Sequence, residues 1–413
     1  MNGIKNLRNR TVKLSIVIAT YNRLNYLEKC INSIIKKKID VNYEVIVVDS
    51  GSNDGTLEFL ESYSEIRVIK DNLRGPVKAY NKGFKVAKGE YIFWVNDDII
   101  ILNDSINKML KFLEENPDIG IGTFNYNIQG EEKKYCFGLR IPNFAIIKAS
   151  LLKELNYLDE SFYYYYVDID IGLKVWEYGL AVVECKEAKL LHLFAEDERK
   201  EYGMSTAGKE EEYFKKKWED KIRDIIESIP KKIIKELFSE EEKIELLVFK
   251  AIKFSRKEMI EEAEEVLRRV LLRNDLEGEI RLNYLLHLAN ILIKDDRFEE
   301  ADRELNDSFL VGNIDIKRKI IISYRFASFC KDEKILGKAK EKFEEIIELT
   351  KKLPLHRGKN RYKGSAHFQL GEIFKKLNEN EEAIAHFQKC LKLIPEHGKA
   401  KEYLSGLEFE RYS

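Results

Sequence analysis

The sequence has few cysteines, and they form no pairing pattern. Its 413 residues include five cysteines, an odd number, and no two lie close enough for a Cys-x-x-Cys motif. They are Cys30, Cys136, Cys185, Cys330 and Cys390. We therefore expect neither a disulfide framework nor a structural zinc site, and the cysteine usage fits a reducing compartment.

The sequence also lacks long apolar runs and an excess of charge. Its first residues do not contain the apolar core of a signal peptide, and no run approaches the roughly 18 residues that span a bilayer. We therefore expect a soluble, cytoplasmic protein without a transmembrane segment. The 71 basic residues nearly cancel the 72 acidic ones, which argues against a nucleic-acid partner.

Two nucleotide-binding motifs are absent. No GxGxxG follows the first predicted strand, and GxxxxGK(S/T) does not occur. These absences argue against a dinucleotide-dependent dehydrogenase and a P-loop enzyme. What is present suffices for a packed core, because 44% of the residues are hydrophobic and 35% are charged. The length allows two or three domains.

Strand and helix patterns alternate through the first half of the chain. Apolar strands are predicted near residues 14–20, 44–49 and 91–95, and polar turns follow each of them. Helical spacing of apolar residues follows the first strand, and a cluster of helix-capping residues at 53–56 follows the second. The alternation predicts an α/β fold with a largely parallel sheet and right-handed crossovers.

The stretch Tyr91–Ile100 is a buried apolar strand that runs into two adjacent carboxylates, Asp97 and Asp98. Neighbouring carboxylates repel each other, so such pairs usually serve a cation, a sugar hydroxyl or proton transfer. A strand followed by an Asp-rich turn is the simpler alternative. The strand ends at 19–23, 49–53 and 96–98 should share one edge of the sheet, where open α/β sheets bind nucleotides.

Four strings carry a resemblance to a known family: SIVIATYNR, VIVVDSGSNDGT, AYNKGFKVAKGEYIFWVNDD and DESFYYYYVDIDIGLKVWEYG. Together with a later histidine they resemble the family 2 glycosyltransferases of GT-A fold, in the order of that family's motifs. The resemblance covers roughly the first half of the chain. It implies an inverting, metal-dependent transfer of a sugar from a nucleoside diphosphate, with a UDP-sugar as the expected donor.

The resemblance also implies roles for individual residues. Tyr21 would pack against the nucleotide base, Asp49 would hydrogen-bond it, and Asp97 would hold the ribose. Asp98 would bind Mn²⁺ or Mg²⁺, and His192 would complete the cation or diphosphate site. The residues assigned to the nucleotide-sugar site are Thr20, Tyr21, Arg23, Asp49, Asn81 and Asp97. The acidic motif reads Asn-Asp-Asp because position 96 is Asn.

Asp168 and Asp170 form a second acidic pair at a predicted helix N-terminus, where the helix dipole favours carboxylates. Helix capping alone could explain one of them. The family commonly has Glu-Asp-x-Asp here, and Val167 stands in place of the first acid. An inverting transferase needs one base that takes the proton of the acceptor hydroxyl. The resemblance assigns that base to Asp168, with Asp170 as the alternative. Residues 211–220 resemble the family's closing YF..KW element.

From about residue 240 only amphipathic helical patterns occur. Residues 363–400 resemble a tetratricopeptide repeat through Leu370, Gly371, Phe374, Ala383, Phe387 and Pro395. The pairs Ala263 and Leu267, Ala301 and Leu305, and Ala339 and Phe343 repeat this pattern less closely. We therefore predict a transferase domain over residues 1–235 and a helical repeat domain over 240–413. The repeats would bind a protein partner or make a homodimer.

Two classes of function remain open from the sequence. The first is a glycosyltransferase that acts on a glycan or a polypeptide acceptor. The second is a catalytically inactive, transferase-like scaffold that works through its repeats, which Asn96 and Val167 favour. A nucleotidyltransferase is a third reading, but the basic, Gly-rich phosphate loop that it needs is absent after the first strand. Its product would be pyrophosphate instead of a nucleoside diphosphate.

Overall fold

The computed structural model describes residues 11–72, 75–127, 135–193, 198–254, 257–273, 276, 278–311, 316–353 and 357–412. The chain divides into two compact units, Met1–Leu246 and Leu247–Ser413. Among the described residues, every strand belongs to the first unit. The predicted fold class, an α/β domain followed by an all-α region, is confirmed. The predicted boundary between residues 235 and 240 stays a prediction.

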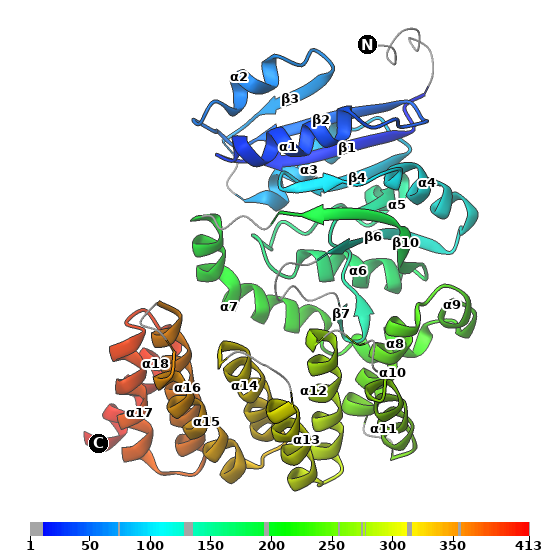
Figure 1. The fold of residues 1–413 in the computed structure, drawn as a ribbon. Coiled ribbons are helices and arrows are strands. Elements are labelled where there is room, and N and C mark those ends of the chain that lie inside the picture. The colour runs from blue at the N-terminus through cyan, green and yellow to red at the C-terminus, as the bar shows by residue number, and fades with distance from the viewer. Residues whose placement is uncertain are drawn as a thin grey trace. The chain divides into compact units, whose positions relative to one another are not determined.

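An eight-stranded sheet forms the centre of the first unit, in the order β3-β2-β1-β4-β9-β6-β10-β5 (Figure 1). Parallel pairs join β1 to β2 and β4, β2 to β3, and β6 to β10, whereas β9 runs antiparallel to both β4 and β6. The largely parallel sheet is therefore confirmed. The strands are β1 (Leu14–Thr20), β2 (Tyr43–Asp49), β3 (Ile66–Lys70), β4 (Tyr91–Asn96), β5 (Ile99–Ile101), β6 (Ile119–Asn127), β9 (Ala145–Lys148) and β10 (Ala181–His192), with a separate hairpin of β7 (Tyr135–Cys136) and β8 (Leu139–Arg140).

The register of the sheet brings the predicted strand ends to one edge. Thr20 lies opposite Asp49 in the ladder of β1 and β2, and Ala19 lies opposite Asn96 in the ladder of β1 and β4. β10 runs in the same direction as β4, because β9 is antiparallel to β4 and β6 while β6 is parallel to β10. His192, the last residue of β10, therefore reaches the same edge.

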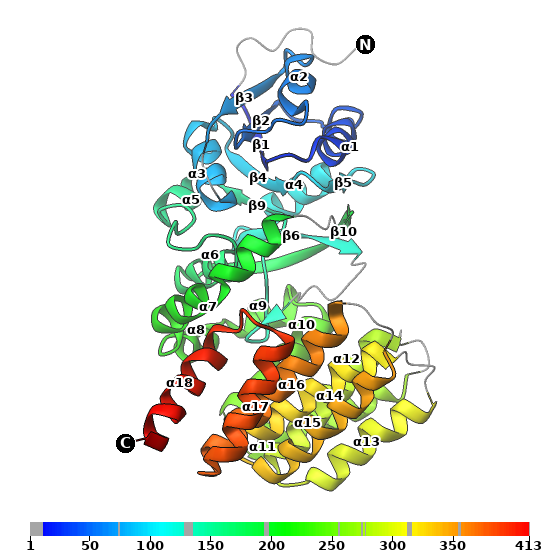
Figure 2. The ribbon, with the colours of Figure 1, turned by 90° about the vertical axis from the view of Figure 1, so that its left-hand side faces the viewer.

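Helices cover both faces of this sheet, with α1 and α4 on one side and α3 and α5 on the other (Figure 2). Coverage on both faces explains why residues 91–95 of β4 are apolar and at most 4% exposed. α3 packs closely, since a Cβ on Gly83 would lie 2.4 Å from Val17. The helices of this unit are α1 (Leu24–Ile35), α2 (Thr56–Glu61), α3 (Pro76–Val86), α4 (Ser105–Glu115), α5 (Ala149–Glu154), α6 (Val167–Glu177), α7 (Glu198–Trp218), α8 (Ile222–Ser228) and α9 (Lys231–Glu236).

The second unit consists of helices packed in successive pairs (Figure 2). The division between the units falls within α10 (Glu240–Phe254). The other helices are α11 (Lys257–Leu271), α12 (Gly278–Lys294), α13 (Phe298–Val311), α14 (Ile316–Asp332), α15 (Leu336–Lys351), α16 (Arg357–Lys376), α17 (Asn380–Leu393) and α18 (Gly398–Tyr412). No helix in the described part of the chain combines the length and the apolar character of a membrane span.

The small positions of the predicted repeats lie between packed helices. Ala263, Ala301, Ala339 and Ala383 have no exposed surface and lie on α11, α13, α15 and α17, respectively. In the last pair, a Cβ added to Gly371 of α16 would lie 2.6 Å from the Phe387 ring of α17. A glycine at this position therefore lets the two helices approach, as the repeat pattern predicts.

Candidate active site at the sheet edge

Side chains tie the loop after β1 to the loop after β2. Asn22, with φ 51°, donates its N–H to the Ser52 hydroxyl at 2.8 Å, and its Oδ1 accepts the N–H of Asn53 at 2.8 Å. Asparagine adopts this left-handed conformation more readily than most residues. These two hydrogen bonds hold the loop after β1 against the loop after β2. Tyr21, the predicted base-stacking residue, is 42% exposed.

Asp97 is buried in a network with the loop after β1. Its Oδ2 accepts a hydrogen bond from the Thr20 hydroxyl at 2.9 Å, and its Oδ1 pairs with Arg23 Nη1 at 2.8 Å. The parallel pairing of β1 and β4 brings these residues together, although more than seventy positions separate them in the sequence. Two residues of the predicted nucleotide-sugar site, Thr20 and Arg23, therefore contact a third, Asp97.

Asp98 lies between two cationic or ionisable side chains. Arg23 Nη2 contacts its Oδ2 at 2.7 Å, and His192 Nε2 approaches its Oδ1 at 3.4 Å. Burial by itself would raise the pKa of the Asp98 carboxyl, but the His192 imidazole and the Arg23 guanidinium hold that pKa well below its usual range. Asp98 is therefore a carboxylate near neutral pH, as a cation ligand must be.

Asp49 presents a buried acceptor at the same edge. Its carboxylate has no exposed surface, and Oδ2 accepts the N–H groups of Gly51 and Ser52, both at 3.1 Å. Its Oδ1 has no hydrogen-bond partner among the described residues. A buried acceptor without a donor is costly to stability. An N–H group of a ligand at this edge would supply the missing donor.

Asn81 lies elsewhere, between α3 and the segment before α6. Its Nδ2 donates to the Leu158 carbonyl at 2.8 Å and to Glu160 at 3.0 Å, while its Oδ1 accepts the Leu158 N–H at 3.0 Å. The side chain is buried in these contacts. They favour a role in holding that segment, so the predicted contact of Asn81 with a nucleotide sugar stays a prediction.

Asp168 and Asp170 both lie in the first turn of α6, but their surroundings differ. Asp170 has no exposed surface, and its Oδ1 accepts the indole N–H of Trp218 at 2.8 Å and pairs with Lys217 at 2.6 Å. Lys174 lies 3.4 Å from its other oxygen. Asp168 is partly exposed. Asp168 therefore keeps exposed surface at this helix start, whereas Asp170 has none.

The last turns of α7 fasten the segment before α6. Lys217 pairs with Asp159 at 2.7 Å, and the Tyr213 hydroxyl donates to the same carboxylate at 3.0 Å. Burial opposes ionisation of Asp159, but Lys217 and neighbouring donors hold its pKa below the usual range. The YF..KW resemblance indicated this part of α7 without showing what it contacts. Glu210, one turn earlier, contacts the same segment and has no such sequence signal.

The two predicted metal ligands are brought together. Among the described residues, no group of three or more acidic, His or Cys side chains is arranged to hold a metal ion. Asp98 Oδ1 is buried and lies within ion-pair distance of His192 Nε2. A carboxylate oxygen with an imidazole fits Mn²⁺, and the oxygen alone also suits Mg²⁺. The pair therefore fits a cation that takes its other ligands from a diphosphate and water.

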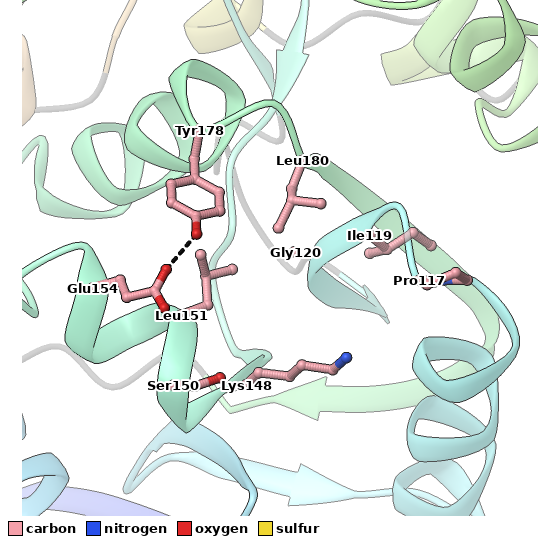
Figure 3. Close-up of a pocket in the computed structure, with 9 residues that line it drawn as sticks. All are labelled: Pro117, Ile119, Gly120, Lys148, Ser150, Leu151, Glu154, Tyr178 and Leu180. Carbon is pink, nitrogen blue, oxygen red and sulfur yellow. Dashed lines mark hydrogen bonds between the residues drawn. The ribbon is translucent and has the colours of Figure 1, made fainter.

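A pocket of about 180 Å³ lies away from this edge (Figure 3). It forms at the start of β6 and the end of β9, and the Tyr178 hydroxyl points to Glu154 across it. None of the predicted site residues lines it, so we place the candidate site at the acidic edge. The lining residues are Pro117, Ile119, Gly120, Lys148, Ser150, Leu151, Glu154, Tyr178 and Leu180.

Comparison with known proteins gives a match on each half of the chain. Residues 15–169 match the family described as glycosyl transferase family 2, and residues 364–397 match the tetratricopeptide repeat. Both matches confirm the resemblances predicted from the sequence. The family 2 match includes the ends of β1, β2 and β4 and reaches Asp168, whereas His192 lies beyond it.

Two relatives with curated names each match about a third of the chain. Glycosyltransferase GlyG of Streptococcus pneumoniae is 30% identical over 149 residues, which are 35% of this chain and 49% of the relative. Poly(ribitol-phosphate) beta-glucosyltransferase of Bacillus spizizenii is 34% identical over an alignment of 167 residues, which covers 35% of this chain and 26% of the relative. The chain thus spans about half or less of the length of the curated relatives that it matches.

Solved structures show weaker similarity. Staphylococcus aureus TarS 1–349 in complex with UDP-GlcNAc has a TM-score of 0.42 at 19% identity, over 72% of this chain and 89% of that one. GalNAc-T7 with UDP, GalNAc and Mn²⁺ has a TM-score of 0.40 at 14% identity, over 45% and 44% of the two chains.

Proposed function

We propose that the chain is an inverting glycosyltransferase that uses a nucleotide-activated sugar, because residues 15–169 match the family described as glycosyl transferase family 2. The observation that carries the proposal is the shared edge of the sheet. There Asp97 contacts Thr20 and Arg23, Arg23 also contacts Asp98, and His192 approaches Asp98 from β10. The carboxyl ends of parallel strands are where α/β sheets bind nucleotides.

The nucleotide would lie over the ends of β1 and β2. The exposed Tyr21 ring would stack on the base, and Asp49 Oδ1 would accept one of its N–H groups. Asp97 would hold the ribose, in place of part of its present contact with Thr20 or Arg23. The proposed donor is a UDP-sugar, since uracil has an imide N–H that Asp49 Oδ1 could accept.

Asp98 and His192 would hold the divalent cation, Mn²⁺ or Mg²⁺. When bound, the cation neutralises the diphosphate and makes it a better leaving group. Arg23 keeps the second oxygen of Asp98 in place and adds positive charge at the same edge. The chain's own contribution is therefore a fixed carboxylate whose second oxygen faces the His192 imidazole.

Asp168 would act as the catalytic base. It takes the proton of the acceptor hydroxyl as that oxygen bonds to the anomeric carbon, while the bond from this carbon to the diphosphate oxygen breaks. The burial of Asp170 and its contacts with Lys217 and Trp218 support this choice. Asp170 would hold α6 in position through those contacts.

The acceptor is proposed as a glycan or a polypeptide. Relatives named poly(ribitol-phosphate) beta-glucosyltransferase and poly(ribitol-phosphate) beta-N-acetylglucosaminyltransferase support a polymeric acceptor. The repeats would bind the acceptor, a protein partner or a second copy of the chain. A cytoplasmic location, where nucleotide sugars would be at hand, also stays a proposal.

The test is product analysis with a panel of nucleotide sugars and Mn²⁺. Release of a nucleoside diphosphate by the wild type is expected, and pyrophosphate would indicate a nucleotidyltransferase. Asp168→Asn should bind the donor normally but release the product about 10²–10⁴-fold more slowly, because that is the usual contribution of a general base. A folded wild type that is inactive with every donor would favour the scaffold alternative.

A further inference from the structure

Glu210 of α7 makes an uncommon set of contacts with the segment before α6. It is 4% exposed, and its Oε2 accepts the backbone N–H groups of Tyr163, Tyr164 and Tyr165 at 3.0, 3.1 and 2.9 Å. Its Oε1 accepts the Thr206 hydroxyl at 2.5 Å. Buried glutamates need partners of this kind, and N–H bonds to a carboxylate are stronger than those between neutral groups.

Three consecutive N–H groups can reach one oxygen only if the chain curls around it. The curl ends at Tyr166, which has φ 64°, a conformation that costs a residue other than glycine about 1–3 kcal/mol. Such a conformation persists only where the surroundings impose it. The Glu210 carboxylate supplies that constraint one residue earlier.

The curled backbone of residues 163–166 continues directly into α6. The Asp170 N–H bonds to the Tyr166 carbonyl at 2.8 Å, so the first helical turn is built on the curl. Asp168 lies within that turn. Lys217 and Trp218, from the same helix as Glu210, hold Asp170 on the buried side. α7 therefore fastens both the start of the turn and its buried face.

We propose that Glu210 is a positioning residue that sets the placement of the Asp168 carboxylate toward the acceptor hydroxyl. The proposal rests on the function proposed above. Glu210 itself touches no substrate in this role. Its carboxylate holds three backbone amides, and through them it fixes the backbone from which Asp168 projects.

The test compares Glu210→Ala and Glu210→Gln with the matched control Glu211→Ala. Glu211 is the next residue of α7, is more exposed, and pairs with Lys215. In Glu210→Ala we expect kcat to fall by about 100-fold, the usual cost of a small misplacement of a catalytic group. The Kd for the donor nucleotide and the acceptor KM should stay within about twofold. Glu210→Gln keeps a carbonyl acceptor and should fall between Glu210→Ala and the wild type.

Hydrogen exchange provides a readout that does not depend on activity. The amides of residues 163–165 should exchange faster in Glu210→Ala than in the wild type or in Glu211→Ala. Unchanged exchange or an unchanged kcat would overturn the proposal, and so would equal losses in kcat and nucleotide affinity. If the Ala variant does not fold, the same criteria apply to Glu210→Gln. An inactive wild type would overturn both proposals, whereas an active wild type with an unchanged kcat in Glu210→Ala would overturn this one alone.

Discussion

Asp98 shows how single residues define the proposed cation site. Arg23 holds one of its oxygens at 2.7 Å, and the other faces His192 at 3.4 Å. A cation bound at this edge must therefore approach Asp98 from the His192 side. The low pKa of Asp98 means that no proton competes with that cation at neutral pH.

Asp98→Asn should weaken cation-dependent binding of the nucleotide. The amide keeps the shape of the side chain but loses its charge and one acceptor. We expect the Kd for UDP in the presence of Mn²⁺ to rise at least about 10- to 100-fold, which is the cost of altering even the outer partners of metal ligands. Calorimetry measures this directly. Asp118→Asn, an exposed aspartate, is the control, and unchanged affinity in Asp98→Asn would remove the metal assignment.

The sequence predicted which acids would gather at the edge but not how each is held. Asp49, Asp97 and Asp98 lie at the carboxyl ends of apolar strands. Parallel pairing brings the carboxyl ends of these strands to the same edge of the sheet. Arg23 pairs with both Asp97 and Asp98 because of the conformation of the loop after β1. The apolar periodicity of the sequence does not predict that conformation. The contacts of Asn81 and Glu210 with distant backbone groups are likewise set by tertiary structure.

At the scale of elements, the close contact of α16 and α17 depends on the absence of a side chain at Gly371. Alanine favours helix by about 1 kcal/mol relative to glycine, but its Cβ would lie 2.6 Å from the Phe387 ring. Overpacking costs about 1–3 kcal/mol. We therefore expect Gly371→Ala to lower the free energy of unfolding, as measured by chemical denaturation.

Gly406→Ala is the matched control, because it lies in α18 with no atom within 4 Å of an added Cβ. This variant should gain up to about 1 kcal/mol from helix propensity alone. Equal gains at both positions would show that α16 and α17 do not pack as described.

The same helix pair contains two facing imidazoles, His367 and His386, with their Nδ1 atoms 3.2 Å apart. Burial lowers the pKa of each to about 4, and nearby lysine charges add to the effect. The unfolded chain would therefore take up protons below about pH 6.5 while the native pair does not. The charged groups that face the pair are Lys340, Lys363, Lys389 and Glu382.

The free energy of unfolding should therefore fall as the pH drops from about 6.5 to about 4. The loss should be roughly 1–2 kcal/mol per imidazole, because solvent at the partly exposed His386 ring screens the charges of the pair. Denaturation at a series of pH values measures the slope. The double variant His367→Gln with His386→Gln should flatten it, and an unchanged slope would contradict the pairing.

Elements with a regular apolar pattern were predictable from the sequence, whereas β9 was not. The strand over residues 91–95 and the helix from Leu24 appear as expected because their apolar patterns are long and regular. β9 lies antiparallel between β4 and β6 and was not expected. Its four residues are too few for periodicity to separate a strand from the start of a helix.

At the scale of the whole molecule, every residue assigned to the donor site precedes α10. We consider a chain that ends at Phe254 and so keeps α10 complete. Its nucleotide affinity and its rate of donor hydrolysis should stay within about twofold of those of the full chain, because an independent unit keeps its own site. Its acceptor choice or its oligomeric state should change. Light scattering and product analysis test both, and a truncated protein identical to the full chain in both would leave the repeats without the proposed role.

The central claim is a working nucleotide-sugar site at the acidic edge of the sheet. Its most direct test is calorimetric titration of the folded, full chain with UDP, GDP, dTDP and CDP, each with Mn²⁺ and again with a chelator. We predict that UDP binds and that its affinity falls at least about tenfold on chelation, since Asp98 and His192 alone leave the diphosphate charge uncompensated. Absence of binding by all four nucleotides would contradict the claim and favour a scaffold that acts through its repeats.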